Sequence, residues 1–247
     1  MSTKVGGVAT GWRSKNGAAL ARPAKVMRPR ATHFLALRLA NCETAVKNVV
    51  ALQERLKERL PLVGHSFTQS TRLHITLAVV AMRHEQSGQG DLKDVSELTA
   101  FMEQFETIVG DLKAPVVELN RLDHFDHEVA FLSPSDPESL RPLAKRIRQG
   151  LHENGFVLPD PPDRPFHPHA TILKLSKVKR SKTRKIISKF LAEEVFNDAN
   201  SSFAEELQTK SWGPPQQVPI IELCTMLEPA APDGFYKVLA SWPFLPQ

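Results

Sequence analysis

The sequence has only two cysteines and no long hydrophobic run. Cys42 and Cys224 are far apart and form no C-x-x-C pair, which argues against a disulfide framework or a thiolate zinc site and fits a reducing compartment. No apolar run approaches the roughly 18–20 residues that a membrane helix needs, so we expect no membrane association. With 247 residues, of which 41% are hydrophobic, the chain can still bury a sizeable core.

Acidic residues are absent from residues 1–32, which carry seven lysines or arginines. The rest of the chain holds the other 25 of the 32 basic residues and all 27 acidic residues, so the high isoelectric point belongs to this tail. Without hydrophobic periodicity, residues 1–31 are predicted to be disordered. The tail lacks the apolar region of a secretory signal. A plain basic tail, a nuclear signal and a mitochondrial transit peptide all stay open, so we expect a cytoplasmic, nuclear or mitochondrial location.

A second stretch without acids lies inside the chain. Residues 174–189 contain eight basic residues in a body that is otherwise slightly acidic. Such a stretch is either a surface that binds anions or a solvated helix face. As candidate substrate-binding residues we select Lys174, Lys179 and Arg180.

The chain repeats one order of elements at an offset of 95 residues. Residues 34–39 and 129–132 are predicted strands, and each is followed by an amphipathic helix and then by a strand that opens on a histidine, His74 or His169. The apolar helix faces keep the same offset: Ala45, Val49, Leu52 and Leu56 lie over Leu140, Ala144, Ile147 and Leu151. We interpret this agreement, which needs no gap, as an internal duplication.

The remaining segments complete a mixed pattern of helices and strands. Helices are predicted at 92–108 and 184–191, a strand at 116–122, and a closing hairpin at 220–227 and 236–242. Neighbouring strands of this kind favour antiparallel sheets. The expected fold class is therefore α+β, with two pseudo-symmetric lobes of antiparallel sheet and helices around a central groove, in one domain over residues 32–247.

Each repeat contains the motif His-x-Thr followed by an aliphatic residue. Side chains alternate along a strand, so His74 shares one face with Thr76, and His169 shares one with Thr171. Two such pairs across a groove could cleave a phosphodiester: one imidazole takes a proton from the attacking group and the other protonates the leaving oxygen. The threonine hydroxyls could donate to the non-bridging oxygens. We therefore select both histidines as catalytic candidates and both threonines as phosphate-binding candidates.

The remaining histidines and aromatic residues could fit other kinds of site. His167 and His169 with His124 or His127 would suggest a metal site, but the spacing matches no familiar ligand set, so neither a metal nor a cofactor is expected. Aromatic side chains that could stack on a nucleobase, or simply pack in the core, are Phe125 and Tyr236. The histidines expected to face solvent are His33, His65, His84 and His152.

The two motif segments resemble the paired motifs of the 2H phosphoesterase superfamily. They are LHITL at 73–77 and FHPHATILKLSK at 166–177. The branch they most resemble is the phosphoesterase domain of the A-kinase anchoring protein type, to whose C-terminal strands residues 222–227 and 234–236 are also similar. The resemblance covers roughly residues 32–245. It implies a bilobal fold, metal-independent chemistry and ligands such as 2′,3′-cyclic phosphates, 2′,5′-linked oligoadenylates or AMP-like nucleotides.

From the motifs and the resemblance together we expect a metal-independent phosphodiesterase that acts on RNA ends or oligoadenylates. The alternative is a non-catalytic nucleotide-binding module or signalling scaffold that uses the same groove. Anchoring members of the branch carry an amphipathic C-terminal helix, which residues 242–247 do not resemble. We therefore expect a monomer that does not bind the kinase regulatory subunit.

Overall fold

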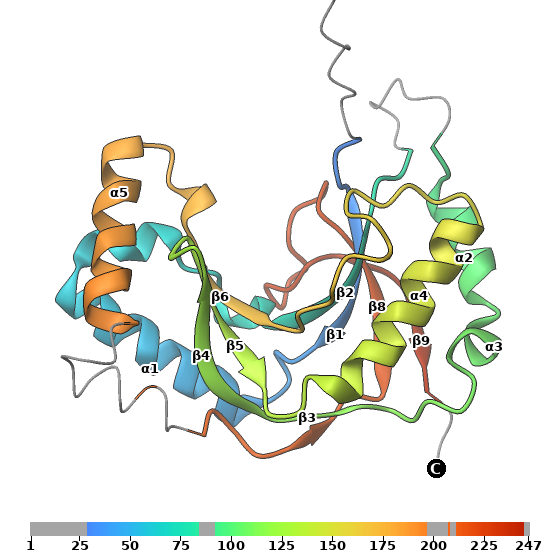
Figure 1. Ribbon diagram of the computed structural model, residues 1–247, viewed down its shortest axis with the longest axis horizontal. Coiled ribbons are helices and arrows are strands. Elements are labelled where there is room, and N and C mark those ends of the chain that lie inside the picture. Colours follow the sequence, from blue (N-terminus) through green and yellow to red (C-terminus); the bar gives the residue numbers. More distant parts are fainter. Residues whose placement is uncertain (1–28, 84–91, 197–206, 208–210, 245–247) are drawn as a thin grey trace, which may run out of the picture.

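The computed structural model describes residues 29–83, 92–196, 207 and 211–244 (Figure 1). Most of the predicted tail, residues 1–31, lies outside this range. Among the described residues, no helix combines the length and the apolar character that a membrane crossing requires.

Seven strands form one antiparallel sheet in the order β4-β5-β6-β2-β1-β8-β9, and β3 pairs with β7 in a small second sheet. The strands are β1 (His33–Arg38), β2 (His74–Val80), β3 (Val116–Val117), β4 (Leu119–Phe125), β5 (Val129–Pro134), β6 (Ala170–Lys174), β7 (Gln216–Gln217), β8 (Ile220–Thr225) and β9 (Val238–Pro243). The predicted α+β class, the antiparallel pairing and the closing hairpin of β8 with β9 are confirmed.

The helices gather at two ends of the sheet (Figure 1). At one end lie α1 (Glu43–Arg59) and α5 (Ser181–Phe190), and at the other lie α2 (Val95–Met102), α3 (Phe105–Val109) and α4 (Arg141–Glu153). The prediction of one continuous helix over 92–108 is wrong, because the segment breaks between α2 and α3. The turn that leads into α4 is capped: the Asp136 side chain accepts hydrogen bonds from the backbone N–H groups of Glu138 and Ser139.

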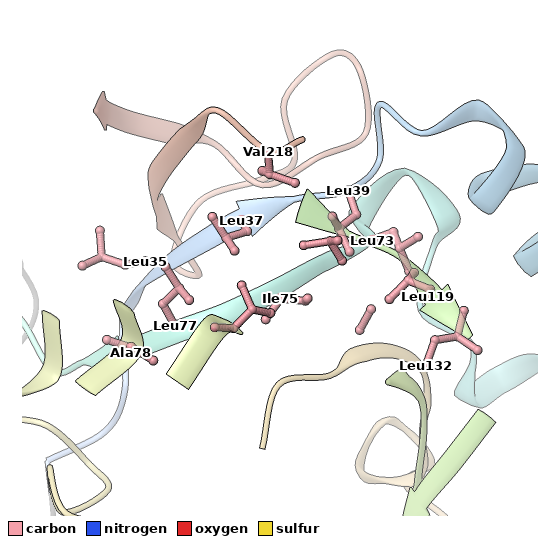
Figure 2. Close-up of a cluster of buried hydrophobic side chains, with 14 of the residues drawn as sticks. Leu35, Leu37, Leu39, Leu73, Ile75, Leu77, Ala78, Leu119, Leu132 and Val218 are labelled. Atoms are coloured by element: carbon pink, nitrogen blue, oxygen red, sulfur yellow. The ribbon is translucent and has the colours of Figure 1, made fainter. Parts of the chain in front are cut away.

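Strand alternation places the side chains of the central strands on two faces of the sheet. On one face, apolar side chains of β1 and β2 lie together in the main core (Figure 2). Leu35, Leu37, Ile75 and Leu77 lie there and have no exposed surface. The alternate positions of β2, His74 and Thr76, are half-buried on the other face.

A β-bulge interrupts the pairing of β1 with β2. Leu35 and Ala36 are consecutive, but their partners are Ala78 and Thr76, so Leu77 is skipped. A skipped residue has no partner in the ladder, and the strand bends there. The bulge therefore lies beside the threonine of the first motif.

β5 and β6 carry the same bulge 95 residues later. Ala130 and Phe131 pair with Leu173 and Thr171, so Ile172 is skipped. All five residues follow their counterparts in the first bulge by 95 positions. The offset seen in the sequence thus extends to the pattern of strand pairing.

The carbonyl oxygen of each skipped residue accepts a hydrogen bond from a helix of the opposite half. On α4, Arg148 Nε donates to Leu77 O at 2.7 Å, and on α1, Gln53 Nε2 donates to Ile172 O at 3.1 Å. These donors are themselves 95 residues apart. The helix that follows β1 therefore contacts β6, and the helix that follows β5 contacts β2.

We expect Arg148→Ala to lower the free energy of unfolding by about 1–3 kcal/mol, because it leaves the buried Leu77 oxygen without this donor. The measurement is urea unfolding followed by circular dichroism. Lys145→Ala is the matched control, since Lys145 is exposed on the same helix, and it should change stability by less than about 0.5 kcal/mol. Equal stability of the two variants would show that the hydrogen bond from Arg148 to Leu77 does not contribute to the free energy of unfolding.

Candidate functional site

The four motif residues lie where the two halves of the sheet join. β2 pairs with β6 through Ile75 and Ala170, and both of these side chains are completely buried on the core face. Their neighbours along each strand therefore share the opposite face. We call these neighbours the His–Thr quartet: His74, Thr76, His169 and Thr171.

The register places each histidine across from the threonine of the other motif. Continuing the antiparallel pairing from Ile75 and Ala170 sets His74 opposite Thr171 and His169 opposite Thr76. Cβ atoms of directly opposite residues lie about 4.5–5.5 Å apart and those of diagonal neighbours about 7–8 Å apart. All four quartet side chains are half-buried. Two imidazoles and two hydroxyls thus lie together on one face of the sheet.

Both imidazoles are oriented by the same kind of hydrogen bond. His74 Nδ1 lies 2.6 Å from Arg72 O, and His169 Nδ1 lies 2.7 Å from His167 O. A carbonyl oxygen can only accept, so Nδ1 carries the proton in both rings. This tautomer leaves Nε2 as the nitrogen that can accept or deliver a proton.

Burial lowers the pKa of both histidines. For His74 it lowers the pKa to about 4, against the opposing effect of the Arg72 carbonyl and with a further contribution from the charge of His169. The pKa of His169 is lowered first by burial and then by nearby cations, among them Lys174 and Arg148. At neutral pH His74 is therefore uncharged, the state that a general base requires.

Aromatic rings flank His74. The ring of Phe34 lies 5.1 Å from the imidazole centroid, and that of Tyr236 lies 5.5 Å away, edge to face. Tyr236 belongs to the connection between β8 and β9, whose Gly234 carbonyl accepts a hydrogen bond from Arg72 Nε at 3.1 Å. The predicted Tyr236 is thus beside the quartet, packed against one of its histidines.

His169 has its own aromatic pair. The rings of Phe125 and Phe131 lie 5.1 and 5.2 Å from its imidazole. Phe131 is buried, whereas the predicted Phe125 is 37% exposed. Beside these rings the surface is hollowed into a groove of about 520 Å³, which is also lined by His167. We call this hollow the β4–β5 groove.

The predicted basic residues are not all at the quartet. Lys174 pairs with Val129 at the end of β6, and the bulge at Ile172 turns it onto the same face as Thr171. Lys179 and Arg180 are exposed before α5, and neither contacts the quartet as far as the described residues show. Only Lys174 acts on a quartet residue, through its charge on His169.

Two positions of the site were not anticipated from the sequence. Arg72 and His167 supply the carbonyl oxygens that orient the imidazoles, and each precedes its histidine by two residues. Their common place before the motif is a sequence signal that could have identified them. The contact of Arg148 with the Leu77 bulge had no such signal, because it depends on which strand the helix meets.

The remaining histidines give one correction. His33, expected to face solvent, is 4% exposed, and its Nδ1 lies 2.9 Å from Thr32 Oγ1. It begins β1, which is covered on both edges by β2 and β8. His65 and His152 are exposed as expected, and His84 lies outside the described residues.

His124 and His127 stack on each other, with ring centroids 4.0 Å apart, and the His127 backbone N–H donates to His124 Nδ1. No group of three or more His, Cys, Asp or Glu side chains within the described ranges is arranged to hold a metal ion.

Comparisons with known proteins identify the family of the chain and solved structures that resemble it. A family model described as the AKAP7 2′5′ RNA ligase-like domain matches residues 31–244. Among solved structures, TT0787 of Thermus thermophilus is 21% identical with a TM-score of 0.54, and the match covers 86% of this chain and 97% of that one. E. coli LigT complexed with 3′-AMP is 19% identical with a TM-score of 0.52, over 87% and 98% of the two chains. No curated protein sequence matches significantly.

The solved structures establish a shared fold, and the family model spans most of the sequence. Its match includes both His-x-Thr motifs and all strands of the sheet. The chain belongs to the AKAP7 2′5′ RNA ligase-like domain family of 2H phosphoesterases.

Proposed function

We propose that this protein is a metal-independent phosphodiesterase that acts on RNA-type nucleotides, with His74 and His169 as its acid–base pair. The observation that carries the proposal is the His–Thr quartet, in which two identically oriented imidazoles and two hydroxyls share one face at the join of β2 and β6. In this proposal the two halves of the sheet act as lobes around a central groove, and the quartet forms its floor.

The proposed reaction uses each member of the quartet once. One imidazole takes a proton through Nε2 from the attacking water or ribose hydroxyl as the new O–P bond forms. The other imidazole delivers a proton from Nε2 to the leaving oxygen as its bond to phosphorus breaks. The hydroxyls of Thr76 and Thr171 donate to the non-bridging oxygens, where negative charge increases in the transition state.

Two substrate classes meet these demands equally. In a 2′,3′-cyclic phosphate, water is the nucleophile, whereas a 2′,5′ bond could be cut by the neighbouring ribose hydroxyl. Both require one base, one acid and a bound phosphate. E. coli LigT, which has the same fold, has been solved as a complex with 3′-AMP, and this supports nucleotides as the first ligands to test.

The direct test is turnover by the purified full chain of adenosine 2′,3′-cyclic phosphate and of 2′,5′-linked oligoadenylate, each with and without EDTA. We expect hydrolysis of at least one substrate at a rate that EDTA does not change, because no metal takes part. Loss of activity with EDTA that a divalent ion restores would contradict the mechanism. Nucleotide binding without turnover would instead support the non-catalytic module.

A further inference from the structure

The β8–β9 connection, residues 226–237, packs against the imidazole of His74. Its Phe235 is completely buried in a small second core that is separate from the main core. The ring of Phe235 lies 6.1 Å from the imidazole, and the ring of Tyr236 lies 4.9 Å from that of Phe34. Two aromatic rings of one connection thus cover one flank of His74.

Side chains from the first half of the chain hold this connection in place. The Gly234 carbonyl accepts hydrogen bonds from Arg72 Nε at 3.1 Å and from Thr71 Oγ1 at 3.3 Å. Gly234 has a φ of +82°, and a Cβ atom at this position would lie 2.8 Å from Thr71 Oγ1. Glycine therefore allows both the left-handed backbone and the close approach.

Arg38 makes a second attachment, through its charge. Its guanidinium forms an ion pair with Asp233 at 2.5 Å and lies 4.1 Å from the centre of the Phe235 ring. Arg38 pairs with His74 across β1 and β2, so its side chain begins beside the imidazole. The Arg38 side chain is only 19% exposed. Because a largely buried guanidinium needs a carboxylate partner, Asp233 ties the connection to this point of β1.

A second carboxylate lies near the same guanidinium. Burial raises the pKa of Glu222, on β8, and the positive charge of Arg38 opposes that effect. Glu222 Oε2 and Arg38 Nε are both buried without a hydrogen-bond partner among the described residues. The direct ion pair is with Asp233, so the charge of Arg38 holds the connection rather than β8.

We propose that Arg38 and Asp233 are positioning residues, whose ion pair holds the β8–β9 connection and its Tyr236 against His74. The inference rests on the proposed function, because the position of Tyr236 matters to turnover only if His74 transfers a proton. Burial is the largest cause of the lowered pKa of His74, and the connection supplies part of that burial. Release of the connection would admit water and raise the pKa of His74 toward its ordinary value.

The charged groups around His74 decide what a pH titration reports. The pKa of Asp233 is held below its usual value, first by the hydrogen bond from Arg38. The ion pair is therefore present at neutral pH and is lost only as the pH falls through this lowered pKa. The charged or titratable groups on the elements around His74 are Arg38 on β1, Arg72 before β2, His169 before β6, Lys174 on β6, Glu222 on β8, and Glu228, Asp233 and Lys237 in the connection. A change of Asp233 alone leaves the others in place.

Tyr236 is the only tyrosine of the chain, so isotope labelling of the tyrosine ring gives a single NMR signal, which comes from the connection. Because the rings of Tyr236 and His74 lie 5.5 Å apart, this signal should follow the protonation of His74, with a midpoint near pH 4 in the wild type. His74→Gln should abolish the titration. Asp233→Asn loses the charge but keeps the oxygen that accepts the Phe235 backbone N–H. In this variant the ring signal should move, and the midpoint should rise toward about 6.5.

Glu228→Gln is the matched control, because Glu228 forms an ion pair with Lys237 at 2.5 Å in the same connection. It should leave the ring signal and the midpoint unchanged. Asp233→Glu keeps the charge and should keep the midpoint near 4. Gly234→Ala changes no charge, but its new Cβ atom meets Thr71 and displaces the connection, so it should raise the midpoint as Asp233→Asn does. Thermal unfolding shows that each variant is folded.

Turnover gives the second measurement. If His74 becomes as accessible as a free histidine, its uncharged fraction at pH 5 falls by about 30-fold, so kcat/KM of Asp233→Asn at pH 5 should fall by up to about 30-fold. At pH 8 His74 is uncharged in both proteins, and their kcat/KM values should agree within about threefold. An equal loss at both pH values would mean a general structural defect and would overturn the inference.

An unchanged Tyr236 signal in Asp233→Asn would also overturn it, and so would a moved signal with an unchanged midpoint. Failure of the two proposals can be told apart, because the NMR titration needs no substrate. A raised midpoint in a protein without turnover would support the role of the ion pair and end the phosphodiesterase proposal. Turnover with the same pH dependence in the wild type and in Asp233→Asn would do the reverse.

Discussion

Replacing either His74 or His169 with alanine is expected to lower kcat by about 10²–10⁴-fold, because each change removes one of the two groups that transfer protons. Thr76→Ala or Thr171→Ala should lower it by about 10–10³-fold, since a phosphate donor is lost but the acid and base remain. The measurement is kcat with the substrate found active, alongside thermal unfolding to show that each variant is folded. A double histidine variant with full activity would refute the acid–base mechanism.

The pH dependence adds a check on which histidine is the base. A base must be unprotonated, and burial lowers the pKa of His74 to about 4. Above that pH His74 is neutral and competent, so the acid limb of kcat/KM should lie near pH 4 rather than near 6.5, the ordinary value for histidine. An acid limb near 6.5 would mean that a different group supplies the base.

The second large effect concerns how substrate binding depends on the length of the oligonucleotide and on the salt concentration. Oligonucleotide ends should bind more tightly than mononucleotides, because the basic residues beyond Lys174 can meet further phosphates, and each contact releases counterions. Three of these residues, Lys179, Arg180 and Lys182, are exposed and form no ion pair within the described ranges. They are the natural set to change together.

Changing those three residues to alanine should reduce the slope of log K against log salt by about 2, since a single strand contributes about 0.7 per neutralised phosphate. The KM for oligonucleotides should rise, whereas cleavage of a small cyclic nucleotide needs only the quartet. The control is a triple alanine variant of exposed lysines on α1 and α4: Lys47, Lys57 and Lys145. If the wild type shows no preference for longer oligonucleotides and the variant keeps the same dependence of log K on log salt, the basic stretch at residues 174–189 is only a solvated helix face.

Local periodicity accounts for what could be predicted from the sequence. Alternation along a strand puts His74 and Thr76 on one face whatever the strand's neighbours are, and the 95-residue offset carries the same result to His169 and Thr171. The order of strands in the sheet was not predictable in this way. The burial of His33 follows from having strands on both edges, which no pattern within β1 reveals.

The contacts between helices and β-bulges could not be predicted from the sequence either. The Leu77 carbonyl is free to accept a hydrogen bond only because the strand register shifts at that point. Arg148 reaches it only because α4, which follows β5 in the sequence, packs against β2 in the other half of the sheet. The β4–β5 groove beside Phe125 and Phe131 also depends on how β4, β5 and the segment before β6 are placed, which no local pattern reveals.

The exchange of helices between the two halves bears on how the molecule unfolds. Each bulge carbonyl accepts a hydrogen bond from the helix of the other half, through Gln53 or Arg148. Domain-swapped partners exchange elements in the same way between two chains. In this chain the exchange is intramolecular, so loss of one half removes a hydrogen-bond donor of the other, and we expect the two halves to unfold together in one cooperative transition.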